Sequence, residues 1–245
     1  MEEEEQQWIE DRSDEEEDNE QPLGFDLFNT DKKDPVDEFK IEIGDETITL
    51  HGVRSRYPHL LQSTGMTLWE GSKNLCNYIC ENPSVVYGKT IVELGAGMGL
   101  CGMIAHKKGA TKVILTDGDT DTLRNMRSNI SSNVDEKAIA KEDVICKQLL
   151  WGKNIESFRS KWTDDGFDIV MGGDIAYAQS SLQILFETAT GLLSNASTAC
   201  FILSFCFRGG VSVGDIEEAC QKFNLDFEKI GEGEKEAIYL IRRRL

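Results

Sequence analysis

The sequence predicts an α/β fold built on a doubly wound, mostly parallel sheet, and three observations support this prediction. From Lys89 onward, short apolar runs alternate with segments of helical length. The runs are almost continuously hydrophobic, as strands are when helices cover both faces of a parallel sheet. The chain ends with two strand-like runs, 225–230 and 237–241, joined by a short glycine-containing segment. This last pair predicts that the sheet finishes with an antiparallel hairpin.

Residues 1–34 form an acidic segment outside this pattern. Of the formal charge of −18, −11 lies between Glu2 and Glu20, where twelve acidic residues accompany one basic residue. Like charges at this density repel one another and leave little apolar surface to bury, so we expect a disordered tail. The rest of the chain carries the remaining −7, and residues 35–245 are expected to form the folded domain.

The folded domain is expected to begin with a short β-hairpin extension over residues 35–60. Residues 39–43 and 47–50 alternate apolar with polar side chains, and a Gly-Asp-Glu turn lies between them. Apolar residues then recur at helical spacing over 69–79, and the following Asn-Pro pair at 82–83 ends this helix.

Five apolar runs predict the parallel strands of the sheet. These runs are 90–94, 113–116, 144–146, 167–171 and 199–205. Segments between them, such as 120–132 and 180–193, have the length and periodicity of helices. Alternating strand and helix units fold with right-handed crossovers, so helices should cover both faces. With the C-terminal pair, the sheet is expected to have seven strands.

A glycine-rich loop follows the first parallel strand, in the sequence Glu93-Leu-Gly-Ala-Gly-Met-Gly99. Glycine adopts positive φ readily and lets the backbone approach a ligand, and ligands bind at the carboxyl ends of strands in such sheets. The dinucleotide fingerprint fails because Leu100 stands where its last glycine is required, and no Gly-Lys-Ser/Thr of a P-loop follows.

Asp117 ends the second parallel strand, 22 residues after Gly95. A carboxylate at this position meets ribose hydroxyls in nucleoside-binding folds. The glycine loop and Asp117 together therefore predict a nucleoside cofactor. Asp119, two residues later, is the expected N-cap of the helix over 120–132.

These residues resemble a known family. Glu93 to Gly99, followed by Leu-Thr-Asp117, is similar to the S-adenosylmethionine loop of the class I, seven-β-strand methyltransferases, whose Rossmann-like sheet also ends in an antiparallel hairpin. Gly173-Asp-Ile-Ala-Tyr177 resembles the Asp/Glu-x-x-Tyr/Phe signature of the protein-lysine methyltransferases in that class, which include the calmodulin-lysine and elongation-factor-lysine enzymes. The resemblance covers residues 39–245 and leaves out the acidic tail.

The resemblance implies S-adenosyl-L-methionine as cofactor, S-adenosyl-L-homocysteine as product and a protein lysine as acceptor. The cofactor-binding residues that it implies are Trp69, Glu93, Gly95, Ala96, Gly97, Gly99, Asp117, Trp151 and Asp174. Glu93 would orient the loop by hydrogen bonds or meet the methionine ammonium, and Trp151 would lie beside the adenine. Asp174 and Tyr177 are the expected catalytic residues, with the carboxylate positioning the amine and the ring facing the methyl group.

The residues leave other functions open. The same cofactor could serve a protein histidine or arginine or a small amine, because the acceptor site lies in loops that no sequence pattern decodes. A methyltransferase-fold binding protein without turnover is the alternative from another class. Asp174 and Tyr177 would then be an N-cap aspartate and a packed tyrosine at the head of the next helix.

Composition argues against several classes of function. The excess of acidic residues lacks the electrostatic footprint of a nucleic-acid binder, so the expected partner is a protein substrate with a basic surface. No run of 18 apolar residues predicts a membrane span, and the charged N-terminus has no signal-peptide core. The seven cysteines are odd in number and scattered through hydrophobic segments, which indicates the reducing cytosol or nucleus. Cys76 and Cys80 have no second Cys/His pair to complete a tetrahedral site, so no metal site is expected; a monomer is the default.

Overall fold

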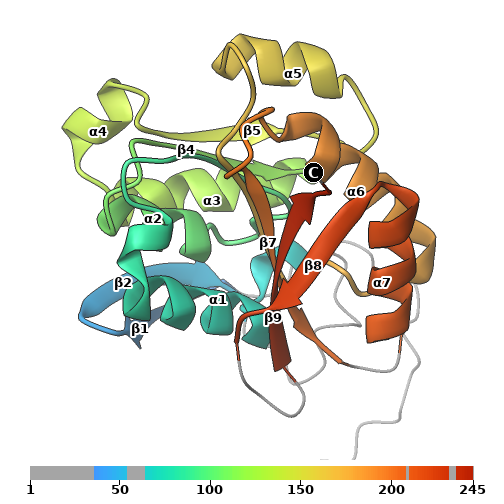
Figure 1. Cartoon of the computed structure of the whole chain (residues 1–245). Coiled ribbons are helices and arrows are strands. Elements are labelled where there is room, and N and C mark those ends of the chain that lie inside the picture. The colour runs from blue at the N-terminus through green and yellow to red at the C-terminus, as the bar shows by residue number, and fades with distance from the viewer. Residues whose placement is uncertain (1–35, 54–63, 208–209, 232–235, 245) are drawn as a thin grey trace, which may run out of the picture. The chain divides into compact units, whose positions relative to one another are not determined.

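The computed structural model describes residues 36–53, 64–207, 210–231 and 236–244, whose arrangement is shown in Figure 1. These residues form a two-stranded hairpin and a seven-stranded sheet with helices on both sides. The predicted disordered tail at 1–34 lies outside the described residues, as do residues 35 and 54–60 of the predicted extension.

The hairpin pairs β1 (Asp37–Ile43) with β2 (Glu46–Gly52) in antiparallel register. Apolar side chains of both strands share one face and join the core on one side of the main sheet. The turn requires glycine, because Gly44 has a φ of +58° and a Cβ there would lie 3.0 Å from the Cβ of Cys80. The predicted N-terminal hairpin is confirmed.

The main sheet has the order β5-β4-β3-β6-β7-β9-β8, and β9 alone runs in the direction opposite to the other six strands. Its strands are β3 (Thr90–Glu93), β4 (Lys112–Asp117), β5 (Val144–Gln148), β6 (Ile169–Gly173), β7 (Cys200–Cys206), β8 (Leu225–Lys229) and β9 (Glu236–Arg243). This confirms the predicted mostly parallel sheet with an antiparallel end. Strand order reverses between β3 and β6, which makes that junction the topological switch point where ligands bind in such folds.

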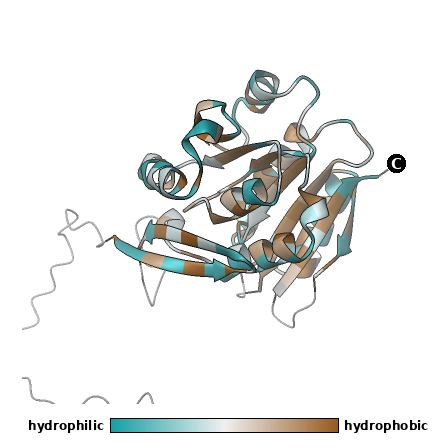
Figure 2. Ribbon diagram, turned by 90° about the vertical axis from the view of Figure 1, so that its left-hand side faces the viewer, coloured by the Kyte–Doolittle hydropathy of each residue, from teal (hydrophilic) through white to brown (hydrophobic). Residues whose placement is uncertain are grey.

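Helices cover the two faces of the sheet separately, and Figure 2 shows the apolar strands enclosed between them. The helices are α1 (Glu70–Glu81), α2 (Leu100–Lys107), α3 (Thr120–Asn133), α4 (Glu136–Ala140), α5 (Ile155–Trp162), α6 (Gln179–Leu192) and α7 (Val213–Lys222), with short 3₁₀ turns η2 (Thr64–Met66) and η3 (Pro83–Val85). Helices α1 to α3 and the hairpin share one core cluster, and α5 to α7 share the other.

One predicted strand begins later than its apolar run suggests. The run at 167–171 becomes β6, Ile169–Gly173, because the two residues before it have other partners. Phe167 makes an isolated bridge to Leu193, and the carboxylate of Asp168 accepts the N–H of Thr90 at 2.8 Å. Both residues precede the β3–β6 ladder, which begins at Ile169. At its other end β6 continues to Gly173, two residues beyond the predicted run and nearer the switch point.

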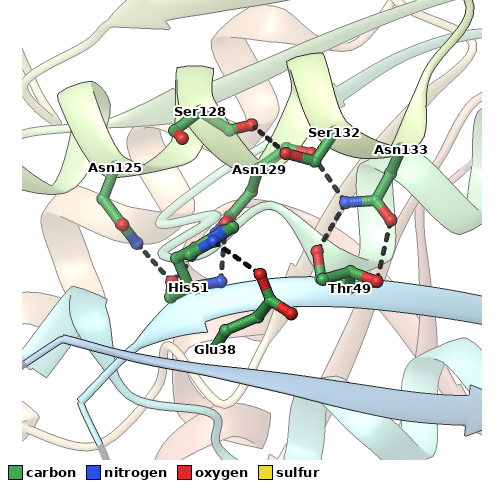
Figure 3. Close-up of polar contacts among 8 residues, drawn as sticks. All are labelled: Glu38, Thr49, His51, Asn125, Ser128, Asn129, Ser132 and Asn133. Atoms are coloured by element: carbon green, nitrogen blue, oxygen red, sulfur yellow. Dashed lines mark hydrogen bonds and ion pairs between the residues drawn. The ribbon is translucent and has the colours of Figure 1, made fainter.

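Three asparagines of α3 bind the backbone of β2 (Figure 3). Asn133 accepts the N–H of Thr49 at 2.8 Å and donates to its carbonyl at 2.6 Å. Asn129 accepts the N–H of His51 at 2.8 Å, and both Asn125 and Asn129 donate to the His51 carbonyl, at 2.7 and 3.2 Å. Residues four apart share a helix face, so these amides stand in for a neighbouring strand along the outer edge of β2.

Candidate active site

A cavity of about 680 Å³ opens at the switch point, at the carboxyl ends of β3, β4, β5 and β6. This volume lies in the range of small-molecule sites. Eight of the residues singled out from the sequence line it: Trp69, Gly95, Ala96, Gly97, Asp117, Trp151, Asp174 and Tyr177. Glu93 and Gly99 do not line it.

The glycine loop is shaped by backbone geometry that a side chain would disturb. Gly95 and Gly97 have φ angles of +57° and +54°, in the left-handed region that favours glycine. A Cβ on Gly97 would lie 2.9 Å from the carbonyl oxygen of Gly65, and one on Gly95 would lie 2.9 Å from Ile175. The loop therefore needs glycine at both positions, and its backbone forms part of the cavity wall.

Glu93 and Gly99 act behind the loop. Glu93 is 2% exposed and accepts the N–H of Gly102 in the first turn of α2 at 2.8 Å. Burial raises the pKa of its carboxyl group to about 8, although the bond from Gly102 works in the opposite direction. Gly99 is the N-cap of α2 with a φ of +86° and packs on Leu115 and Met126. Of the two roles expected for Glu93, the hydrogen bond that orients the loop and its helix is present.

Asp117 ties the loop to the end of β4. Its Oδ2 accepts the N–H of Gly97 at 3.1 Å, and its Oδ1 accepts the N–H of Asp119 at 3.1 Å. Burial raises the pKa of this carboxyl group, and the backbone hydrogen bonds oppose the rise. Each oxygen keeps accepting capacity toward the cavity, as a carboxylate has about four acceptor sites. Asp119 caps α3 through the N–H groups of Asp121 and Thr122, as predicted.

Two tryptophans stand on different walls of the cavity. Trp69 precedes α1 and donates its indole N–H to the carbonyl of Thr64 at 2.9 Å. Trp151 follows β5, and its ring lies 3.5 Å from the place of a Cβ on Gly95. Both residues line the cavity, and their contact with a cofactor stays a prediction.

Asp174 anchors α1 to the end of β6. The residue is 6% exposed and has a φ of +64°, an uncommon conformation for a residue with a side chain. Its Oδ2 accepts the N–H of Gly71 at 3.2 Å, and its Oδ1 accepts the N–H of Cys206 at 3.4 Å. Trp69, the N-cap of α1, has no side-chain cap bond, so Asp174 supplies the capping carboxylate from a distant part of the chain.

The alternative interpretation of 174–177, an N-cap aspartate and a packed tyrosine at the head of the next helix, is wrong. The N-cap of α6 is Ala178, so Asp174 does not cap the next helix. Tyr177 is not a packed tyrosine either, because it is 60% exposed and lines the cavity. The backbone after β7 passes close by: a Cβ on Gly210 would lie 2.7 Å from the carbonyl oxygen of Tyr177. The structure thus brings Asp174 and Tyr177 to one end of the cavity, as predicted.

Sequence reasoning missed a wall made by residues 64–68. Thr64, Gly65, Thr67 and Leu68 line the cavity, and Gly65 lies against the glycine loop at Gly97. A Cβ on Gly65 would lie 2.6 Å from the Thr122 hydroxyl, so this glycine permits η2 to approach α3 closely. The only local signal was that glycine, because the contact joins segments that lie far apart in the sequence.

No group of three or more His, Cys, Asp or Glu side chains is placed to hold a metal ion in the part of the chain that the structure describes. None of the helices described has the length and apolar character needed to cross a membrane.

Comparison with known proteins adds to this geometry. Mouse protein N-lysine methyltransferase METTL21A is 31% identical over 147 residues, which are 60% of this chain and 64% of that protein. Protein N-terminal and lysine N-methyltransferase EFM7 of Cryptococcus neoformans is 28% identical over 136 residues, 55% of this chain and 45% of that protein. The match therefore spans less than two thirds of either relative.

A solved structure and a family model point the same way. Ribosomal protein L11 methylase from Lactobacillus delbrueckii subsp. bulgaricus superposes with a TM-score of 0.54 at 18% identity, covering 73% of this chain and 81% of that one. This likeness is one of fold. The model of a family described as lysine methyltransferase matches residues 58–223, more than half of the chain. The chain belongs to this lysine methyltransferase family.

Proposed function

We propose that this protein transfers a methyl group from S-adenosyl-L-methionine to a lysine side chain of another protein. One observation supports the proposal: the glycine loop, Asp117, Trp151, Asp174 and Tyr177 all line a single cavity at the switch point. Family membership supports it, as do the names of METTL21A and EFM7, which describe lysine methyltransferases.

The cavity residues fit the proposed cofactor chemically. Gly95 and Gly97 line the cavity with their backbone, and a Cβ on either would meet Ile175 or the carbonyl oxygen of Gly65 at 2.9 Å. Asp117 has two carboxylate oxygens with which to accept hydrogen bonds from the two vicinal hydroxyls of a ribose. The Trp151 ring offers a flat apolar surface for a nucleobase. When bound, the cofactor supplies an electrophilic methyl group on a sulfonium.

The acceptor amine must lose its proton before it can react. A lysine amine in water has a pKa of about 10.4, and desolvation lowers that value. The Tyr177 ring at the cavity would displace water from the lysine stem. Asp174, fixed by the N–H groups of Gly71 and Cys206, would hold the amine by a hydrogen bond in line with the methyl group. Positioning, rather than a strong base, is the contribution we assign to these two residues.

Binding and transfer can be tested separately. Titration with S-adenosyl-L-methionine should show binding to the wild type, and Asp117→Ala should weaken it by about tenfold or more, because a charge-assisted hydrogen bond pair is lost. Failure of the wild type to bind the cofactor would contradict the proposal.

Transfer is then measured with tritiated methyl cofactor and a cell lysate, followed by hydrolysis and amino-acid analysis. Label in methyllysine is the expected result. Asp174→Asn and Tyr177→Phe should lower transfer while cofactor binding persists. Label in methylhistidine or methylarginine would favour another acceptor, and no label with the cofactor bound would favour a binding protein.

The proposed substrate carries a basic surface. Support comes from charge, because the chain has a formal net charge of −18, of which −11 lies between Glu2 and Glu20. Such a tail would speed encounter with a basic partner at low salt. Deletion of residues 1–34 should lower kcat/KM at low ionic strength and have little effect at high ionic strength. Equal kcat/KM values at low salt would discard this steering role.

The proposed location is the cytosol or nucleus. All seven cysteines are free thiols, and five of them lie in the two core clusters as small apolar residues. Disulfides form and persist in oxidising compartments, so this thiol content suits a reducing one. Imaging of a fluorescent fusion of the full chain would check the location.

A further inference from the structure

Among the described residues, no strand pairs with the main-chain groups on the outer edge of β1. The N–H groups of Thr49 and His51 point to α3, so these residues do not exchange hydrogen bonds with the residues opposite them on β1, Lys40 and Glu38. In an antiparallel pair such positions alternate with bonded ones. The main-chain groups of Glu38, Lys40 and Glu42 therefore point away from β2, and within the described ranges no other strand pairs with them.

The two edges of the hairpin thus differ in kind. The asparagine side chains of α3 occupy the outer edge of β2, as Figure 3 shows. Beside the outer edge of β1 lies an open groove of about 470 Å³. The groove is lined by residues 39–43 of β1, by Leu68 and by Glu70, Lys73 and Asn77 of α1. The three α1 residues follow helical spacing, so they form one stripe that faces the strand edge.

The groove leads to the active-site cavity. Leu68 lines both. The open end of the hairpin lies at that cavity: the N–H of Val53 bonds to the Met66 carbonyl at 2.7 Å, and a Cβ on Gly52 would meet the side chain of Met98, a cavity residue. The turn end lies against Cys80, near the far end of α1. A chain following β1 from its turn end would therefore run toward the cavity.

Charge indicates what kind of chain the edge would accept. Exposed Asp37, Glu38 and Glu42 outnumber Lys40 on β1, which leaves a net charge of −2 on the strand. Glu70 and Lys73 on the α1 stripe neutralise each other at 3.1 Å. A second copy of β1 would bring the same sign of charge, and exposed edge charges oppose such pairing. A basic segment is complementary.

We infer that β1 is a docking strand for the protein substrate: an extended basic segment near the acceptor lysine adds to its free edge as a third strand of the hairpin. This inference rests on the proposed function. Main-chain hydrogen bonds to Glu38, Lys40 and Glu42 give affinity, and alternate side chains of the segment contact the α1 stripe and give specificity. The acceptor lysine then extends past Leu68 into the cavity.

Hydrogen exchange of the full-length protein tests this docking directly. The probe is a peptide of about 15 residues with one lysine, in which arginine alternates with valine or threonine; a matched peptide has glutamate in place of arginine. The arginine peptide should slow exchange of the amides within residues 37–43, because Glu38, Lys40 and Glu42 gain hydrogen bonds. The glutamate peptide should leave their exchange unchanged.

Lys40→Pro and Lys40→Ala form a matched pair of variants. Both remove the charged side chain, but only proline removes the outward N–H, which β2 does not use. Lys40→Pro should weaken peptide binding by about fivefold to tenfold relative to Lys40→Ala, the value of one main-chain hydrogen bond. Thermal melts check that each variant folds. Glu42→Lys leaves the backbone intact and should weaken binding of the arginine peptide by a similar factor, because it reverses a negative charge on β1.

The inference is overturned if neither peptide binds, if the arginine peptide binds without slowing exchange within 37–43, or if both Lys40→Pro and Glu42→Lys fold and bind as the wild type does. Cofactor titration is run in parallel. If the peptide slows exchange within 37–43 but the protein does not bind the cofactor, the proposed function is refuted and the docking inference is kept. If the protein binds the cofactor and transfers methyl groups but the peptide does not slow this exchange, the docking inference is refuted and the proposed function is kept.

Discussion

The asparagine contacts between α3 and the hairpin make a graded prediction for stability. Asn129 is fully buried and makes three hydrogen bonds: it accepts the N–H of His51 and donates to the carbonyls of His51 and Met98. Asn133 makes two to Thr49, and Asn125 makes one to His51. Replacement by alanine should therefore cost most at position 129 and least at position 125.

The magnitudes follow from the number of groups left without partners. A hydrogen bond contributes about 0.5–1.5 kcal/mol net, and a polar group left unsatisfied in a buried site costs about 1–3 kcal/mol. Asn129→Ala should lower the free energy of unfolding by about 2–4 kcal/mol, Asn133→Ala by about 1–3 and Asn125→Ala by about 1. For a domain of this size, each kcal/mol shifts Tm by about 2–4 °C.

Urea unfolding followed by circular dichroism measures these values, with Ser128→Ala as the matched control. Ser128 lies on the exposed face of the same helix, between two of the asparagines, and its side chain does not reach β2. That variant should be neutral or slightly stabilising, since alanine is the better helix former. The reasoning would be refuted if Asn129→Ala lowered the free energy of unfolding by less than about 0.5 kcal/mol, or if Asn125→Ala lowered it by more than Asn129→Ala does.

Three further predictions concern single residues. The pKa of Glu93 is about 8 in the folded protein against 4.5 ordinarily, so the free energy of unfolding should fall as pH rises between these values, by up to about 1.4 kcal/mol per pH unit. Glu93→Gln should abolish that slope in urea melts across this range. Gly97→Ala should cost about 1–2 kcal/mol from its positive φ and weaken cofactor binding in titration, whereas Ala96→Gly should leave the loop backbone unstrained. Arg243→Ala should cost about 2 kcal/mol in the same melts, because its guanidinium caps the carbonyls at the end of α6; an unchanged midpoint would show that the cap is dispensable.

Local patterns predicted the parts of the site that depend on neighbouring residues. The glycines of the loop and the carboxylate at Asp117 belong to a strand-loop-helix unit whose geometry is set by sequence spacing. Asp174 and Tyr177 were placed at the cavity because the carboxyl ends of parallel strands meet at one edge of the sheet. The capping of α3 by Asp119 is local as well, because its side chain accepts the N–H groups of Asp121 and Thr122, two and three residues later.

What the sequence could not indicate were contacts between distant segments. The wall made by residues 64–68 reaches the cavity because Gly65 packs against Thr122 of α3 and Gly97 of the glycine loop. For Glu93 the sequence left two roles open, and the hydrogen bond to Gly102 of α2 is the one present, because the direction of a strand-end side chain depends on packing. The α3 asparagines at 125, 129 and 133 are spaced like a helix face, yet nothing local says that their partner is a strand.

The anchoring of α1 by Asp174 has a consequence for the order of folding. Gly71 and Asp174 lie 103 positions apart, so this cap can form only after β3 to β6 have assembled or been brought close. Closing so long a loop costs entropy that local contacts do not repay. During synthesis, the start of α1 leaves the ribosome long before its capping carboxylate exists. The wall of the cavity formed by α1 should therefore be among the last parts to become ordered, and the cavity should acquire affinity for its ligand only at the end of folding.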